Sequence, residues 1–171
     1  MPDRLVVGDL PRLRLIQPED NPQIATVIRT VMTEHACDGP GYSIHDTEVD
    51  HMYTAYNRPG AAFWVIASDT TVYGGGGYAR LEGEVAQTCE LKKMYFLPEI
   101  RGKGWGKALM TTILQQAPKD GYTHIYLETV YRMQTANALY QKFGFIPLDQ
   151  AMGQTGHSSC DAYYLRALGK E

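Results

Sequence analysis

Apolar and polar positions follow two periods along the chain, and together they predict a mixture of helices and strands. Spacing of three and four residues predicts one helix over Gln23–His35 and another from the glycine-rich segment to about Ala117. Two further helices are predicted, a looser one around Asp46–Tyr56 and a short one over Gln134–Phe143. Apolar runs predict strands at Leu13–Ile16, Phe63–Ala67, Val72–Leu81, Glu84–Phe96, Ile125–Thr129, Phe145–Leu148 and Tyr163–Leu168.

The order of these elements defines the fold class. Phe63–Ala67 and Val72–Leu81 are expected to form a hairpin across Ser68–Thr71, and the second half contains a strand–helix–strand unit. The class is therefore α/β, or α+β with a largely antiparallel first half. No repeat or linker interrupts the pattern, which predicts one domain over residues 1–171.

The strand before the glycine-rich segment changes phase. Cys89 and Leu91 alternate as one face of a strand should, but the apolar set resumes one residue out of step at Met94 and Phe96. One extra residue near Lys92–Lys93, a β-bulge, would cause this shift and would splay the strand away from its neighbour. A strand buried on both faces is the alternative.

Composition narrows the partners and the compartment. Apolar residues make up 44% of the chain and charged residues 20%, which is typical of a globular protein, and a net charge of −3 gives nucleic acid no general attraction. Three widely spaced cysteines indicate a reducing compartment. The run Ala61–Ala67 is too short to span a bilayer, and MPDRLVVGDL lacks the apolar core of a signal peptide. We expect a cytoplasmic protein without membrane or nucleic-acid partners.

The segment RGKGWGKALM, residues 101–110, places three glycines among three cations directly before a helix. It fits neither a Walker A loop, because Ala108 follows Lys107, nor the GxGxxG dinucleotide fingerprint. A strand, a glycine loop and a helix N-terminus still form an anion cradle, since unpaired N–H groups and the helix dipole point at the loop. A surface turn with solvated cations is the alternative.

Two segments resemble the signatures of the GNAT N-acetyltransferase superfamily. Arg101, Gly104 and Gly106 fill the fixed places of its acetyl-CoA motif, [RQ]-x-x-G-x-[GA]. The segment ANALYQKFGF, residues 136–145, matches the second signature, A-x-x-L-Y-x-x-x-G-F. The order of elements from Leu13 to Leu168 also resembles a whole GNAT domain, and the likeness is to small stand-alone bacterial members.

The resemblance implies a splayed central sheet flanked by helices, with acetyl-CoA between the strands that end near Phe96 and Thr129. Main-chain groups of residues 94–96 would bond the pantetheine, and the amides of residues 101–106 would hold the pyrophosphate. The expected cofactor-binding residues are Met94, Tyr95, Phe96, Arg101, Gly102, Lys103, Gly104, Trp105, Gly106 and Lys107. Met133 departs from the family pattern, in which an asparagine often bonds the cofactor arm.

Acetyl transfer to an amine needs a neutral amine, a polarised thioester and a proton for the leaving thiolate. Glu90 occupies the place where several GNAT enzymes keep a basic glutamate, and an ion pair with Lys92 is its alternative role. Tyr140 resembles the tyrosine that bonds the CoA sulfur and reprotonates it, and an aromatic anchor against the sheet is the alternative.

The acceptor pocket is expected from segments 35–45, 74–80 and 154–161, with Tyr42 and His157 as candidate contacts. His157 could equally be an exposed loop residue, and Cys160 is expected to be a small buried residue in a strand-like context. The five histidines lack metal-ligand spacing, so no metal is predicted. No Cys–His nucleophile pair is evident, which favours direct transfer over an acyl-enzyme.

The sequence therefore predicts acetyl-CoA-dependent transfer to the amine of a small molecule or amino acid. Two alternatives stay open: a protein N-terminal or lysine acetyltransferase, which would need an open groove for peptide, and a non-catalytic acetyl-CoA-binding module. By analogy with the superfamily, two copies of the chain could pair through the C-terminal strands as a homodimer.

Overall fold

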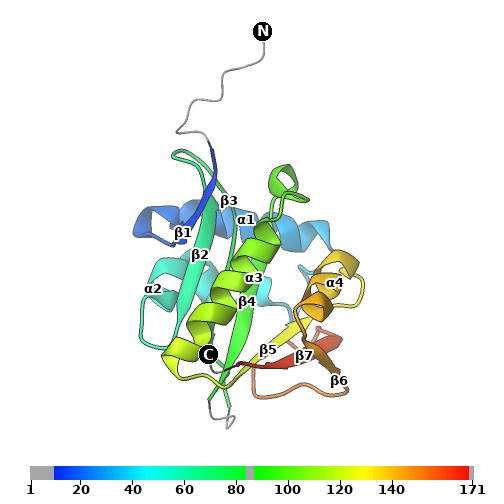
Figure 1. Cartoon of the computed structure of the whole chain (residues 1–171). Helices are drawn as coiled ribbons and strands as arrows, with labels where there is room; N and C mark the ends of the chain where they lie inside the picture. The colour runs from blue at the N-terminus through cyan, green and yellow to red at the C-terminus, as the bar shows by residue number, and fades with distance from the viewer. Residues whose placement is uncertain (1–9, 84–86, 170–171) are drawn as a thin grey trace.

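A seven-stranded sheet runs through the molecule, with helices on both faces (Figure 1). The computed structural model describes residues 10–83 and 87–169. Along the sheet the strands follow the order β1-β2-β3-β4-β5-β7-β6. The strands are β1 (Arg12–Leu15), β2 (Ala62–Ala67), β3 (Val72–Arg80), β4 (Thr88–Phe96), β5 (His124–Thr129), β6 (Ile146–Leu148) and β7 (Ala162–Ala167).

Two apolar clusters, one on each face of the sheet, form the core. Helices α1 (Asn21–Glu34) and α2 (Met52–Tyr56) pack into one cluster, and α3 (Trp105–Gln116) and α4 (Gln134–Lys142) pack into the other. The predicted apolar stripe of α1 is buried against the sheet, as its spacing requires. This layered arrangement confirms the mixed fold class.

Strand pairing confirms the predicted antiparallel first half. Strands β1 to β4 pair antiparallel in sequence, and Ser68 N–H donates to Thr71 O at 2.9 Å in the predicted hairpin turn. Strands β4 and β5 are parallel and pair only over Thr88–Glu90 and His124–Tyr126. Beyond Glu90 the two strands separate, which leaves the β5-facing edge of β4 without a strand partner in the described structure.

The predicted β-bulge is confirmed. Gly75 lies opposite Tyr95 and Gly77 lies opposite Lys92, so two residues of β4, Lys93 and Met94, face the single residue between those glycines. Lys93 has a φ of 53°, a left-handed conformation that ordinary residues adopt rarely. The bulge therefore lies where β4 leaves β5, next to the separation of the strands.

The four glycines at 74–77 lie in the middle of β3, where β2 and β4 approach it closely. A Cβ on Gly77 would collide with the carbonyl oxygen of Ala62 and would lie 2.8 Å from the Cα of Phe63. Real Cβ atoms do not make such contacts with backbone, so the close approach requires glycine at this position.

Most predicted boundaries differ from the structure by one or two residues, and two differ by more. The α-helix predicted around Asp46–Tyr56 is present only over Met52–Tyr56, because Thr47–Asp50 is a 3₁₀ turn. Asp46 is extended, with ψ 134°, and its carboxylate bonds the side chains of Lys93 and His157 instead of capping a helix. The start of the predicted strand at Glu84 lies outside the described residues, and β4 begins at Thr88.

Candidate active site

The glycine loop takes a backbone conformation that strongly favours glycine. Gly102 has a φ of 73° and Gly104 a φ of 88°, and α3 begins directly after Gly104. A Cβ on either residue would meet no protein atom within 4 Å. The space in front of this loop is therefore open to a ligand, and conformation rather than crowding selects glycine there.

The loop presents a row of free donors. Among the described residues, no backbone N–H from Gly102 to Lys107 has an acceptor. The helix dipole adds positive potential at the same place. Exposed Lys103 and Lys107 add charge, whereas both terminal nitrogens of Arg101 lie 2.8 Å from Glu34 carboxylate oxygens. The arrangement suits an anion such as a phosphate.

The separation of β4 and β5 opens a cavity of about 50 Å³. Its walls come from β4, from β5 and from the two loops at 37–43 and 157–160. The candidate acceptor contacts Tyr42 and His157 both line it, as do Tyr95 and Met133. The cavity therefore joins residues predicted for acceptor binding to residues predicted for cofactor binding.

Glu90 is a buried carboxylate that faces this cavity. The residue is 5% exposed, and no hydrogen-bond donor reaches its carboxylate within the described part of the chain. Burial raises the pKa of Glu90, the charges of Lys92 and His157 oppose that effect, and the result is a pKa of about 7. The alternative of an ion pair with Lys92 is wrong, because Lys92 Nζ pairs with Glu48 at 2.9 Å.

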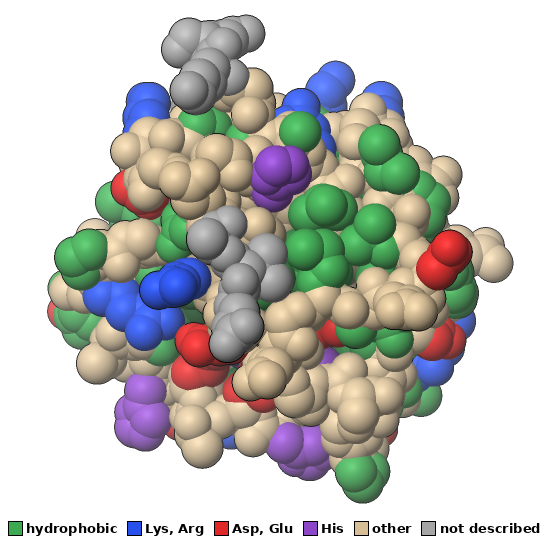
Figure 2. Space-filling view, turned by 90° about the horizontal axis from the view of Figure 1, so that it is seen from below, with side chains coloured by type: hydrophobic (Ala, Val, Ile, Leu, Met, Phe, Trp, Pro, Cys, Tyr) green, Lys and Arg blue, Asp and Glu red, His purple; other side chains and the backbone are tan. Residues whose placement is uncertain are grey.

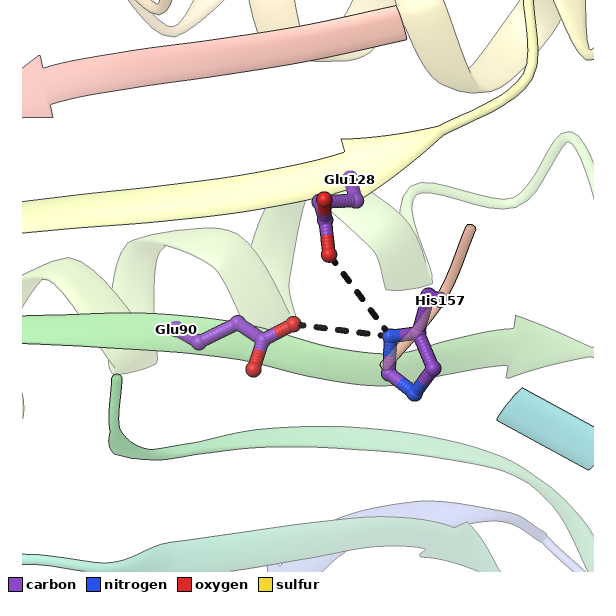
Figure 3. A group of neighbouring side chains, drawn as sticks. All are labelled: Glu90, Glu128 and His157. Carbon is purple, nitrogen blue, oxygen red and sulfur yellow. Dashed lines mark ion pairs between the residues drawn. The ribbon is translucent and has the colours of Figure 1, made fainter. Parts of the chain in front are cut away.

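Glu128 on β5 is a site residue that the sequence analysis missed. Its carboxylate points toward Glu90 and His157 (Figure 3), and it accepts hydrogen bonds from the hydroxyls of Tyr126, at 3.0 Å, and Thr155. His157 Nδ1 lies 3.7 Å from Glu128 and 3.9 Å from Glu90. An acidic residue in an otherwise apolar strand, IYLET, was the available signal.

His157 lies between carboxylates. Its side chain is 9% exposed, so the alternative of an exposed loop residue is wrong, and its Nε2 lies 3.0 Å from Asp46. Burial by itself lowers the pKa of His157, but the hydrogen bond with Asp46 and the nearby carboxylates of Glu128 and Glu90 raise it to about 9. His157 is therefore an imidazolium at neutral pH, with Nδ1–H directed at the two glutamates.

Asp46 connects His157 to the bulge. Lys93, whose side chain is 1% exposed, lies 2.9 Å from Asp46 and 3.1 Å from Glu48. Burial tends to raise the pKa of Asp46, but the hydrogen bond from His157 and the charge of Lys93 outweigh it and lower the pKa to about 2. The bulge thus directs a lysine into the network that surrounds Glu90.

The pair between His157 and Asp46 predicts a pH dependence of stability. The pKa of His157 is raised from 6.5 to about 9, so its charged form stabilises the fold fully below pH 6.5, and this stabilisation is lost as the pH rises through 9. The pKa of Asp46 is lowered from 3.8 to about 2, so its carboxylate stabilises the fold above pH 3.8, and this stabilisation is lost as the pH falls through 2. We expect His157→Gln to lower the free energy of unfolding most between about pH 4 and 6.5, with the difference from wild type shrinking toward pH 9. Urea unfolding at several pH values measures it, and a pH-independent difference would contradict the pair.

Ligand atoms of Glu90, Glu128 and His157 lie within 4.8 Å of one another, close enough for a metal ion. A protonated imidazole offers no lone pair at Nδ1, and the raised pKa of His157 keeps it protonated. The cluster is thus accounted for by ion pairing, and the expectation of no metal stays a prediction.

Tyr140 on α4 packs in the second apolar cluster. Its ring centroid lies 5.9 Å from both Phe145 and Tyr164. The Tyr140 hydroxyl makes no hydrogen bond to any described residue. Among the described residues, the hydroxyl of Tyr56 is the only fully buried side-chain oxygen or nitrogen without a hydrogen-bond partner. Tyr140 is 7% exposed and does not line the cavity around Glu90, so its ring anchors the helix and its place beside the CoA sulfur stays a prediction.

Asn137 on α4 has a purely internal role. Asn137 donates to Val130 O at 2.9 Å and to Met133 O at 2.8 Å, and accepts from the Tyr164 hydroxyl at 2.7 Å. It therefore has no free polar group to replace the asparagine that Met133 displaces. The expectation for Cys160 is wrong, because it is half-buried in the loop before β7, where its backbone N–H closes a turn onto His157 O.

Comparison with known proteins assigns these features to one family. The family model described as "Acetyltransferase (GNAT) family" matches residues 28–145, which include β4, the glycine loop and α4. The chain belongs to the GNAT acetyltransferase family. As a member of it, the protein is an acetyl-CoA-dependent acyltransferase, so the expected superfamily and enzyme class are confirmed.

Relatives of this GNAT chain support the assignment over most of its length. The uncharacterized N-acetyltransferase YjgM of Escherichia coli K12 is 44% identical over 159 residues, which cover 92% of this chain and 95% of that protein. A GNAT acetyltransferase from Staphylococcus aureus has the same fold, with a TM-score of 0.79, 18% identity and coverage of 93% and 99%. A putative acetyltransferase from Salmonella typhimurium, solved with its cofactor acetyl-CoA, has a TM-score of 0.71, 16% identity and coverage of 94% and 95%.

The face of the molecule shown in Figure 2 carries mixed charge. On the visible part of the face in Figure 2, acidic and basic side chains are scattered among neutral ones, without a continuous field of Lys and Arg. None of the helices that the structure describes is long and apolar enough to cross a membrane.

Proposed function

We propose that the protein transfers the acetyl group of acetyl-CoA directly to the amine of a small molecule, with Glu90 as general base. One observation carries this proposal: a buried carboxylate with a pKa of about 7 faces the cavity between the splayed strands without a hydrogen-bond donor of its own. Such a group is ready to accept a proton near neutral pH, as base catalysis requires.

The cofactor would bind along the opened edge of β4. In this proposal the free amides of residues 102–107 hold the pyrophosphate, with Lys103 and Lys107 beside them, and the backbone of Met94–Phe96 bonds the pantetheine. Arg101 acts through its bond to Glu34, which ties the glycine loop to the end of α1. The Salmonella relative, which holds acetyl-CoA, supports the choice of ligand.

The reaction moves protons and electrons in a fixed order. Glu90 accepts a proton from the acceptor ammonium, the amine lone pair attacks the thioester carbonyl, and the carbon–sulfur bond breaks as the tetrahedral intermediate collapses. Tyr140 donates its hydroxyl proton to the CoA thiolate, and the second proton that the nitrogen must lose to become an amide returns to the Tyr140 oxygen through water. Tyr42 and His157 would contact the acceptor from the two loops that line the cavity.

The proposal is tested by incubating the protein with acetyl-CoA and a panel of amines while free CoA is detected. We expect CoA release that depends on an amine, together with an acetylated product of matching mass. Acetyl-CoA binding without turnover of any amine would overturn the proposal. Turnover confined to peptides or proteins would favour the alternative of a protein acetyltransferase.

The glycine cradle gives a first mutational prediction. Gly104→Asp places a Cβ and a carboxylate in the open space where the pyrophosphate would lie, on a residue whose φ of 88° already disfavours side chains. We expect the affinity for acetyl-CoA to fall at least about tenfold, roughly 1.4 kcal/mol. Calorimetry measures it, with Gly121→Asp as a control at a similar φ of 89° away from the loop. Normal binding of acetyl-CoA by a folded Gly104→Asp variant would contradict the proposal that the glycine loop holds the pyrophosphate.

A homodimer through the C-terminal strands stays a prediction. Strand β6 forms the edge of the described sheet, and its Ile146 is 65% exposed. Sedimentation of the purified protein measures the oligomeric state.

A further inference from the structure

The basic side chains that line the cavity are already paired with carboxylates of the chain. Lys92 Nζ lies 2.9 Å from Glu48, and Lys93 Nζ lies 2.9 Å from Asp46. His157 Nε2 lies 3.0 Å from Asp46. Among the described lining residues, no basic side chain is left free to bind a negative group of a ligand.

One acid of the cavity lacks a close partner. Glu90 has no hydrogen-bond donor within the described residues, its ion pair with His157 Nδ1 is long at 3.9 Å, and Glu128 stands beside it on the next strand (Figure 3). Counted together, the network holds the carboxylates of Asp46, Glu48, Glu90 and Glu128 against the cations of Lys92, Lys93 and His157. An incoming ammonium restores the balance of charge, whereas a further carboxylate adds to the excess.

Arg132 lies outside this network but donates to two residues that line the cavity, to Cys37 Sγ at 3.3 Å and to the Tyr42 hydroxyl at 3.2 Å. Its guanidinium donates to the carbonyl oxygens of His35 and Ala36 at 2.9 Å each and lies 5.9 Å from the ring centroid of Tyr42. It is exposed and does not line the cavity. Arg132 could meet a distant part of a long acceptor, but it is not placed beside an amine held at Glu90.

We infer that the acceptor is a primary amine whose amine-bearing carbon carries no carboxylate, rather than a free α-amino acid. This inference rests on the proposed function, because it assumes that the acceptor amine is held at Glu90. An α-carboxylate would lie within two bonds of the nitrogen and would enter the cavity with it. There it would lose its hydration without gaining a cation, next to Glu90 and Glu128.

Matched acceptors that differ only in the carboxylate test this. Phenethylamine against phenylalanine, and 3-methylbutylamine against leucine, keep the amine and the chain constant, and each compound has only one amine. The free amines hold their ammonium proton at least as tightly as the amino acids, so a preference for them cannot come from easier deprotonation. We expect kcat/KM to be at least about tenfold higher for the amine of each pair. Equal values, or a preference for the amino acids, would overturn the inference.

A peptide amide with a free N-terminus distinguishes small amines from peptides as the acceptor. Its terminal amine also lacks a neighbouring carboxylate, so both classes fit the inference. Efficient acetylation of that peptide supports the inference and assigns the acceptor to peptides. Acetylation of phenethylamine or 3-methylbutylamine alone supports it and assigns the acceptor to small amines.

A charge change inside the network gives a second test. Glu48→Gln removes the carboxylate partner of Lys92 while keeping the shape of the side chain, so it creates a free cation at the cavity. We expect phenylalanine to become a relatively better acceptor for this variant. The ratio of kcat/KM for phenethylamine to kcat/KM for phenylalanine should fall at least about threefold. The exposed Glu19→Gln serves as the matched control, and melting temperature reports folding. An unchanged ratio in a folded Glu48→Gln variant would count against the inference.

Binding separates this inference from the proposed function. Calorimetry with the CoA-bound protein measures the affinity for phenethylamine and phenylalanine without any need for turnover. If no amine is acetylated but phenethylamine binds at least about tenfold more tightly, the proposed function fails and the selectivity of the cavity stands. If amines are acetylated but both ligands bind alike, the selectivity fails and the proposed function stands.

Discussion

Replacing Glu90 with glutamine is expected to lower kcat/KM by about 10²–10⁴-fold at neutral pH, the range typical of a lost general base. The amide has nearly the same shape as the carboxylate but cannot take a proton from the acceptor. The wild-type rate should rise with pH through about 7, where Glu90 loses its proton. In Glu90→Gln that rise should disappear, leaving only the increase due to deprotonation of the amine in solution.

The pH–rate profile decides between a catalytic and a structural Glu90. The loss should be largest near neutral pH and smallest at high pH, where the amine deprotonates unaided. If the variant keeps the shape and height of the wild-type profile, Glu90 is structural and water or another group takes the proton.

Stability gives an independent control on the same variant. The pKa of Glu90 is raised by burial from 4.5 to about 7, so the folded state holds its proton more tightly than the unfolded state, and wild-type stability falls as pH rises through that window. Glutamine carries no charge and avoids this fall. Glu90→Gln should therefore be at least as stable as wild type at pH 8, and thermal unfolding measures it. A catalytic loss without a loss of stability is the result expected of an active-site residue.

Replacing Tyr140 with phenylalanine is expected to lower kcat roughly tenfold to a few hundredfold, with a smaller change in KM. The ring keeps its packing against Phe145 and Tyr164, and the hydroxyl has no hydrogen bond to any described residue that the change could break. The substitution removes only a contact to the sulfur that would strengthen as negative charge develops there. A thiolate is a fair leaving group, so the loss lies at the low end for general acid catalysis.

Steady-state kinetics on both substrates measure the effect. The melting temperature of Tyr140→Phe should differ from that of wild type no more than it does after a typical surface substitution. Tyr164→Phe offers a matched control, because it removes a hydroxyl that does make an internal hydrogen bond, to Asn137 at 2.7 Å. That variant should lose stability more than it loses kcat. An unchanged kcat in a stable Tyr140→Phe protein would show that the hydroxyl is dispensable and that water supplies the proton.

Local patterns in the sequence were enough to predict most of the sheet and its bulge. The phase shift between Leu91 and Met94 marks the extra residue directly, because side chains alternate strictly along a strand. The segment from Asp46 to Tyr56 was mispredicted for the opposite reason. Its conformation depends on Asp46 meeting Lys93 and His157, residues 47 and 111 positions away, and no local period records such contacts.

The candidate site was predictable only in part. Glu90 and Tyr140 were reached through motifs, and His157 through its place in a polar loop, but the ion pairs that give His157 a pKa of about 9 depend on the closed fold. Glu128 stayed hidden because its closeness to Glu90 follows from the parallel register of β4 and β5. The register of two strands is a property of the tertiary structure, and it cannot be predicted from the sequence of one strand alone.

The glycine run of β3 has a consequence for any survey of random variants. Between Tyr73 and Tyr78 the strand contributes no side chains, so the space beside it is filled from outside, by Phe96 next to Gly74 and by Phe63 next to Gly75. Every missense change in these four codons adds at least a methyl group to a volume that is already occupied. Inactive clones that map here would report a chain that cannot assemble its sheet rather than an impaired reaction. A map of intolerant positions would therefore show two separate groups, one around the chemistry and one along β3, which does not line the cavity although segment 74–80 was expected to do so.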